Sequence, residues 1–177
     1  MHRATRSKYG TSPAQAHAMV ERVREVARGE GLNFDFEHIR PGNTLDAHRL
    51  LHFGATQGVQ DALKEQLFRG YFVEGATISS PDTLVELAVR VGLDADRAQS
   101  VVHSDAFLRE VREDEFEAKE LGISGVPFFV FDERIAVSGA QPVAVLAQAL
   151  EQAFASQPNE GQSVETPEGA YCGPDGC

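Results

Sequence analysis

One segment, residues 122–142, constrains the fold more than any other part of this 177-residue chain. A glycine ends a helical pattern, and Val126-Pro127 then opens an unbroken apolar run that reaches Phe131. Three polar residues follow and a second apolar run begins at Ile135, which predicts a β-hairpin. Pro142, a little further on, is typical of the start of a helix. The segment therefore predicts the order loop, strand, turn, strand, helix.

The first strand of this hairpin, Phe128 to Phe131, has no polar position. We therefore expect both of its faces to be covered, as in an interior strand of an α/β sheet. Pro127 can only open the strand because it has no N–H to donate. The hairpin supplies one neighbouring strand, and no segment of the chain is a convincing second one. The sequence thus predicts an unpaired strand edge with exposed apolar surroundings, a site for dimerisation or aggregation.

Upstream of the hairpin, apolar residues recur mainly at helical spacing. Ser12-Pro13 and Ser80-Pro81 each place a capping residue before a proline at the first helical position. Helices are expected to begin near Pro13, Thr44, Pro81, Asp94 and Ser104, and another helix carries residues 63–72. The short Phe34–Phe36 segment is expected to be extended.

Two helices have faces that can be assigned from the pattern. The helix starting at Ser104 is expected to bury a stripe formed by Phe107, Val111, Ala118 and Leu121. Its acidic residues are interpreted as a solvated face rather than a metal site or an acid/base pair; they are Glu110, Glu113, Asp114, Glu117 and Glu120. The last helix is expected to cover one face of the sheet with Val143, Leu146, Leu150 and Phe154.

Three regions follow from this pattern. Residues 1–122 form a mainly helical domain, and residues 123–155 form a hairpin followed by a helix. Residues 156–177 are rich in glycine, proline and acids, with too few apolar side chains to fold independently, so we expect a flexible tail.

Composition excludes several classes of function. The net charge is -11, which disfavours binding to phosphate backbones and to anionic membranes. No stretch approaches the about 18 apolar residues of a membrane span, and the N-terminus has no apolar signal core. The expected location is therefore cytoplasmic. The two cysteines, Cys172 and Cys177, are too few for a disulfide scaffold.

The amino-acid sequence of residues 122–142 resembles that of the DsbA family of thiol–disulfide oxidoreductases, specifically its FrnE-like branch. Several upstream motifs match that branch in the right order: Lys8-Tyr9-Gly10, Gly31-Leu32, Asn43-Thr44, Ala47-His48-Arg49-Leu50-Leu51, Tyr71-Phe72, Glu117-Ala118 and Leu121-Gly122. The resemblance covers roughly residues 5–155. It implies an α/β, thioredoxin-like fold with a large helical insertion, of which residues 123–155 are the C-terminal half.

The resemblance also implies a site. In that family the Val126–Pro127 bond is cis, faces the redox centre and offers backbone groups to an extended substrate. From the residues alone, a trans bond that simply starts a strand is the alternative, because X–Pro bonds in folded proteins are mostly trans. The plain interpretation of His48, on its helix, is a packing residue rather than a catalyst, since no nucleophile accompanies it.

One part of the family pattern is absent from the sequence. FrnE-like proteins begin with a strand, a C-x-x-C motif at a helix N-terminus and another strand, and this chain has none of these. A cysteine at a helix N-terminus has a lowered pKa, which makes it a reactive thiolate. We therefore expect Met1 to be an internal or misassigned start, or the gene to be truncated. The absent strand is the neighbour that Phe128 to Phe131 lacks.

Cys172 and Cys177 are then the candidate redox pair, held together by a Gly-Pro-Asp-Gly turn. An inert tail is an alternative. A metal site is a third, although two sulfurs do not complete the usual zinc shell, so we expect no metal.

The predicted function is thiol–disulfide exchange or disulfide isomerisation on protein thiols or disulfides, with Val126 and Pro127 holding the substrate and no cofactor. A glutathione-dependent isomerase of the 2-hydroxychromene-2-carboxylate type is an alternative suggested by the same resemblance. A second alternative is a non-catalytic module that binds polypeptide by strand addition. A homodimer through the strand edge is a further expectation.

Overall fold

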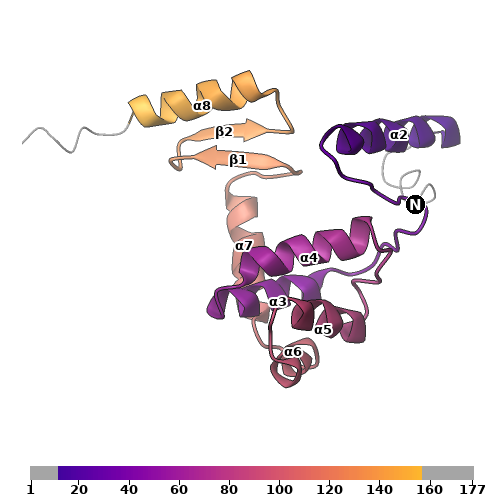
Figure 1. The fold of residues 1–177 in the computed structure, drawn as a ribbon. Helices are drawn as coiled ribbons and strands as arrows, with labels where there is room; N and C mark the ends of the chain where they lie inside the picture. The colour runs from indigo at the N-terminus through magenta and orange to yellow at the C-terminus, as the bar shows by residue number, and fades with distance from the viewer. Residues whose placement is uncertain (1–11, 157–177) are drawn as a thin grey trace, which may run out of the picture. The chain divides into compact units, whose positions relative to one another are not determined.

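The computed structural model describes residues 12–156, which divide into two compact units on either side of the Ala118–Lys119 bond. The first unit is helical (Figure 1). Its elements are α2 (Pro13–Gly29), α3 (Leu45–Thr56), α4 (Gln60–Phe72), α5 (Pro81–Arg90), α6 (Ala95–Val102) and most of α7 (Leu108–Glu120). The second unit contains β1 (Phe128–Phe131), β2 (Ile135–Ser138) and α8 (Val143–Ala155). Each unit is described separately below.

Three helices begin at the caps that the sequence predicts. Ser12 forms a capping box with Gln15 at the start of α2, and Ser80 accepts a hydrogen bond from the backbone of Thr83 at the start of α5. Asp94 does the same for α6 through the N–H of Arg97. These side chains satisfy N–H groups that have no partner inside the helix.

The core of the helical unit is aliphatic. α3 packs against α4, α5 and α6, and α5 packs against α4 and α6. The largest fully buried side chains are four leucines, Leu50, Leu63, Leu84 and Leu87. A smaller core joins Val20 of α2 to Phe36 and Ile39, with Phe34, Tyr71 and Phe72 packed against it.

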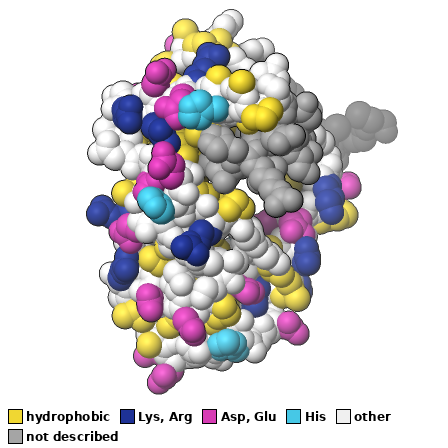
Figure 2. Space-filling model, turned by 90° about the vertical axis from the view of Figure 1, so that its right-hand side faces the viewer, with side chains coloured by type: hydrophobic (Ala, Val, Ile, Leu, Met, Phe, Trp, Pro, Cys, Tyr) yellow, Lys and Arg dark blue, Asp and Glu magenta, His cyan; other side chains and the backbone are white. Residues whose placement is uncertain are grey.

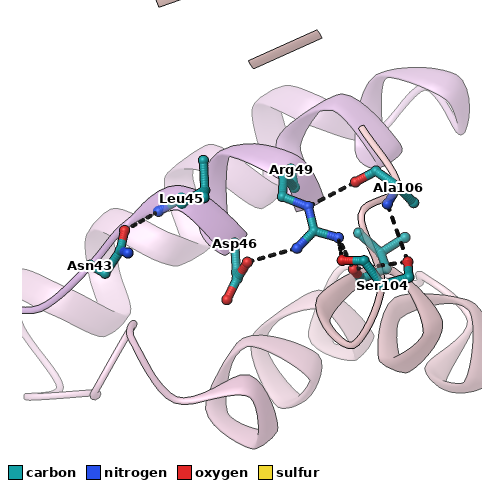
Figure 3. Close-up of polar contacts among 7 residues, drawn as sticks. Asn43, Leu45, Asp46, Arg49, Ser104 and Ala106 are labelled. Atoms are coloured by element: carbon teal, nitrogen blue, oxygen red, sulfur yellow. Dashed lines mark hydrogen bonds and ion pairs between the residues drawn. The ribbon is translucent and has the colours of Figure 1, made fainter. Parts of the chain in front are cut away.

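A buried arginine ties α3 to the α6–α7 connection (Figure 3). Arg49 is only 4% exposed. Its guanidinium donates to the carbonyl of Ala106 and to Asp46, both at 2.8 Å, and also to the carbonyls of Val101 and Ser104. Because a buried charge is costly unless it is fully hydrogen-bonded, this set of acceptors explains how the position tolerates arginine.

The second unit is a hairpin with a helix beside it (Figure 1). β1 and β2 pair antiparallel with Phe128 opposite Ser138 and Phe131 opposite Ile135. Asp132 and Glu133 both have positive φ, and the N–H of Arg134 donates to the carbonyl of Phe131 at 3.1 Å. This is the type I′ geometry that matches the twist of the flanking strands, so the predicted tight turn is present. α8 contacts both strands.

The structure corrects four expectations, of which the first two concern residues 34–36 and the helix α7. Residues 34–36 are irregular rather than extended. The α7 helix begins at Leu108, not at Ser104, because Phe107 has a φ of 61° and the Ser104 hydroxyl accepts from the nearby N–H of Ala106. Of the stripe expected on this helix, only Val111 is fully buried and Leu121 is exposed.

The third correction concerns the face of α8. The buried positions of this helix are Ala149 and Ala153, with Leu146 half-buried. Three of the four residues expected against the sheet, Val143, Leu150 and Phe154, are exposed instead. α8 is apolar over most of its circumference, so its periodicity could not identify the packed side.

The fourth correction concerns β1. Its two faces are not fully covered, since Phe128, Phe129 and Phe131 are half-buried and Val130 is exposed. Within residues 12–156, β1 pairs with β2 and with no other strand. In the described part of the chain, the predicted unpaired edge is therefore present.

Candidate functional site

The loop that enters β1 carries the residues predicted to hold a substrate. After α7, Gly122 adopts a φ of 68°, which only glycine adopts readily, and the chain turns toward β1. The Val126–Pro127 peptide bond is cis. The Val126 side chain is 89% exposed, and no side chain or backbone atom crowds the neighbouring Gly125. The loop thus presents its backbone and the Val126 side chain to solvent.

The hydrogen bonds of the hairpin show which backbone groups of β1 bond to β2 and which have no strand partner within residues 12–156. The N–H of Gly139 donates to the carbonyl of Pro127 at 2.8 Å, so Pro127 and Gly139 extend the ladder by one pair. In an antiparallel ladder, every second residue turns its N–H and C=O toward the partner strand. The backbone N–H and C=O groups of Phe129 and Phe131 therefore point toward β2. Those of Phe128 and Val130 point toward the opposite edge of β1. That edge is continuous with the Val126–Pro127 loop.

The second unit also has exposed apolar side chains. Val130 belongs to β1 itself, and α8 contributes the exposed stripe of Val143, Leu150 and Phe154, the last of these 75% exposed. Exposed apolar side chains that are grouped on a surface mark binding sites, and Val143, Leu150 and Phe154 share one stripe of α8 by their helical spacing.

The predicted thiol pair, Cys172 and Cys177, lies outside the described residues. Residues 12–156 contain no cysteine, so the described part of the chain supplies no thiol beside the Val126–Pro127 loop. Within the same residues, no three His, Cys, Asp or Glu side chains converge as potential metal ligands. No helix in the described part of the chain is long and apolar enough to cross a membrane.

The acidic face of α7 is a solvated surface, as predicted. Glu113, Asp114, Glu117 and Glu120 are exposed, and Arg109 pairs with Glu113 at 2.8 Å. Asp114 accepts from Nε2 of His52 on α3 at 2.9 Å. On the face of the molecule drawn in Figure 2, acidic and basic side chains are interspersed rather than gathered into one field.

A cavity between α3 and α4 was not anticipated from the sequence. We call it the α3–α4 cavity; its volume is about 360 Å³. Its walls are mostly apolar, with Leu51, Phe68 and Phe72 among them, and its polar lining residues are Thr44, His48, Lys64 and Tyr71. Apolar residues at helical spacing look the same in a sequence whether they fill a core or line a cavity, so the sequence carries no signal for this cavity.

Two of these polar side chains have no fixed partner. His48 is exposed rather than packed, and within residues 12–156 its imidazole makes no hydrogen bond, so the packing interpretation of this residue is wrong. Tyr71 is half-buried, and its hydroxyl has no partner in the same part of the chain. Burial raises the pKa of Tyr71 above its ordinary value, which keeps the hydroxyl protonated.

Comparison with known proteins agrees with the fold. The family model described as the DSBA-like thioredoxin domain matches residues 2–151. The chain is similar to a probable DsbA oxidoreductase from Streptomyces coelicolor, whose crystal structure superposes with a TM-score of 0.84 at 40% identity. That similarity covers 99% of this chain and 74% of the other. The α/β, thioredoxin-like fold with a helical insertion is thereby confirmed.

A curated relative gives a more distant match. The ClpXP adapter protein SpxH of Halalkalibacterium halodurans is 29% identical over 110 residues, which is 58% of this chain and 36% of the relative. The chain therefore spans about a third of the length of that relative. The family model, which covers most of the chain, establishes that this protein belongs to the DSBA-like thioredoxin domain family.

Proposed function

We propose that this protein is a thiol–disulfide oxidoreductase or disulfide isomerase of the FrnE-like branch, acting on protein thiols and disulfides. The observation that supports this best is the exposed Val126–Pro127 loop and its continuity with the unpaired edge of β1, in a chain of the DsbA family. An extended polypeptide bonds readily to such an edge through its own backbone. Val126 and Pro127 are proposed to hold the substrate.

Cys172 and Cys177 are the proposed exchange pair, because they are the cysteines that this chain contains. The thiolate of one attacks a substrate disulfide, the substrate S–S bond breaks, and one substrate sulfur leaves as a thiolate. The second cysteine then attacks the resulting mixed disulfide. The substrate leaves as a dithiol, and the chain retains a Cys172–Cys177 disulfide, so two electrons have passed to the substrate.

Reduction of insulin disulfides by dithiothreitol tests the exchange. We expect the wild-type chain to accelerate reduction, and we expect the Cys172→Ser, Cys177→Ser double variant to show only the uncatalysed rate. The two proteins should have the same far-ultraviolet circular dichroism if the substitutions leave the fold intact. Equal rates for the wild type and the double variant would remove the redox role from this pair.

A second candidate function, non-catalytic binding of polypeptide by strand addition, is favoured by the same unpaired edge of β1. A homodimer that pairs two such edges is a related proposal. Val130→Pro should block both, since the Val130 N–H points away from β2 and its loss breaks no bond of the hairpin. Phe129→Pro is the matched control, because it removes an N–H that faces β2 and should unfold the hairpin.

Peptide binding measured by fluorescence anisotropy and oligomeric state measured by sedimentation separate these proposals. Loss of peptide binding in Val130→Pro with insulin reduction retained would assign the edge to binding alone. Unchanged binding and unchanged oligomeric state in this variant would contradict both uses of the edge. Glutathione as a co-substrate and a cytoplasmic location stay predictions, tested by activity assays with glutathione and by cell fractionation.

A further inference from the structure

We propose that the α3–α4 cavity binds a small amphipathic carboxylate, an acid whose body is an aromatic ring or a branched alkyl group. The residues that carry this inference belong to the helical unit and are separate from Val126, Pro127 and the two cysteines. The proposal therefore goes beyond thiol–disulfide exchange and stands without it.

The size and walls of the cavity suit the apolar part of such a ligand. Its volume of about 360 Å³ lies within the range of small-molecule pockets. Leu51 and Phe72 are half-buried and Phe68 is 53% exposed, so apolar surface of the cavity still contacts solvent. A ligand ring or alkyl group that covers this surface removes it from water, which favours binding.

The polar lining determines the head group. Thr44, His48, Lys64 and Tyr71 can each donate a hydrogen bond, and no Asp or Glu lines the cavity. The absence of acidic residues from this lining is informative, because the chain has 27 acidic residues against 16 Lys and Arg, so acidic side chains are the commoner charged type. An apolar cavity with donors and one cation at its polar positions is complementary to a carboxylate, and it is unfavourable for an ammonium group.

Two neighbouring cavities lack this character. The cavity bordered by Leu32 and Phe34 contains both Glu65 and Arg69 in its lining. The cavity that shares Thr44 and His48 with the proposed site is lined by Arg112 and Glu115, which pair with each other at 2.5 Å. In both, a carboxylate of the protein belongs to the lining itself, whereas Asp61, the partner of Lys64, does not line the α3–α4 cavity.

The donors of the proposed site are available to a ligand. His48 and Tyr71 make no side-chain hydrogen bond with any described residue. Lys64 pairs with Asp61 at 2.9 Å, but the two side chains are 50% and 92% exposed. Surface ion pairs of this kind contribute little to stability, so Lys64 can turn to a bound anion at small cost.

Three probes that share one apolar body test the head group: 4-phenylbutyrate, 4-phenylbutan-1-ol and 4-phenylbutylamine. Titration of the full chain is followed by calorimetry and by protein-observed NMR. We expect saturable binding of the carboxylate, roughly tenfold tighter than the alcohol, because a charge-assisted hydrogen bond is lost in the alcohol. The amine should bind most weakly.

Substitutions then locate the site. Lys64→Met should weaken the carboxylate roughly tenfold and leave the alcohol unchanged, whereas Lys119→Met, at an exposed lysine outside the cavity, should change neither. Leu51→Trp should fill the cavity and abolish binding of both probes. Thr44→Trp is a second blocking variant at an exposed rim position, for use if Leu51→Trp does not fold.

Several results would overturn the proposal. Absence of saturable binding, equal affinity for the carboxylate and the amine, or equal losses in the Lys64 and Lys119 variants would each do so. Binding of an unfolded polypeptide at the cavity, without competition from 4-phenylbutyrate, would assign the cavity to apolar side chains of a protein instead.

Discussion

At the scale of single residues, Arg49 shows how a charged side chain can hold helices together. Its hydrogen bonds reach Asp46 on its own helix, the carbonyl of Val101 in the last turn of α6, and the carbonyls of Ser104 and Ala106 in the segment that joins α6 to α7. The planar guanidinium presents several donors in fixed directions, which a single ammonium group cannot reproduce. The position therefore specifies arginine rather than any cation.

Arg49→Met should lower the free energy of unfolding by about 3 kcal/mol, because it leaves buried acceptors without partners. Arg49→Lys should recover only part of this loss. Arg112→Met is a suitable control, since its pair with Glu115 is exposed and should contribute less than about 1 kcal/mol. Urea unfolding measures all three, and an Arg49→Met variant as stable as the wild type would refute the structural role.

The ion pairs of Glu74 lead to a prediction about how stability depends on pH. Hydrogen bonds from Arg90 and then Arg69 hold the pKa of Glu74 below its ordinary value of 4.5. A lowered pKa in the folded state means that the pairs stabilise the fold above about pH 4.5 and that this contribution is lost as the pH falls through the folded-state pKa. Glu74→Gln should therefore reduce the loss of stability between about pH 5 and pH 3.

The matched control for this prediction is Glu86→Gln. Glu86 is also exposed on the helical unit and forms no ion pair within residues 12–156. Thermal melts at the two pH values compare the variants. If both substitutions change the acid sensitivity equally, the Arg69–Glu74–Arg90 group is not its source.

At the scale of elements, the sequence predicted those features that depend on neighbouring residues. The caps at Ser12, Ser80 and Asp94 and the hairpin after Pro127 follow from short-range patterns and are present. The start of α7 could not be predicted, since a left-handed Phe107 is set by packing against the α3–α6 core rather than by local preference. The α3–α4 cavity could not be predicted either, because apolar residues at helical spacing are found both in packed cores and in the walls of cavities.

The face of α8 gives a prediction at this scale. Ala153 is buried and Phe154, its neighbour in sequence, is exposed. Ala153→Leu should destabilise the second unit by about 1–3 kcal/mol through overpacking. Phe154→Ser should change stability by less than about 0.5 kcal/mol and should reduce self-association by removing exposed apolar surface. Thermal melts and sedimentation give both readouts, and the reverse pattern would mean that the packed face is misassigned.

At the scale of the whole molecule, the two units have different proposed tasks. The second unit presents the Val126–Pro127 loop and a strand edge suited to an extended polypeptide, while the helical unit contains a cavity suited to a small anion. The family could be identified from sequence motifs in both units. The role of Cys172 and Cys177 stays a prediction, because their glycine- and proline-rich segment has no apolar pattern in the sequence and lies outside the described residues.

The most direct test of thiol exchange at this site is to trap its intermediate. The Cys177→Ser variant is mixed with an extended peptide whose cysteine is joined to 5-thio-2-nitrobenzoate. Attack by Cys172 should release the coloured thiolate and leave a peptide adduct on Cys172, detected by mass spectrometry. Val126→Asp in the same background should slow adduct formation roughly tenfold, about 1.4 kcal/mol, without changing the melting temperature. An absence of adduct, or equal rates with and without Val126→Asp, would contradict thiol exchange at the Val126–Pro127 loop.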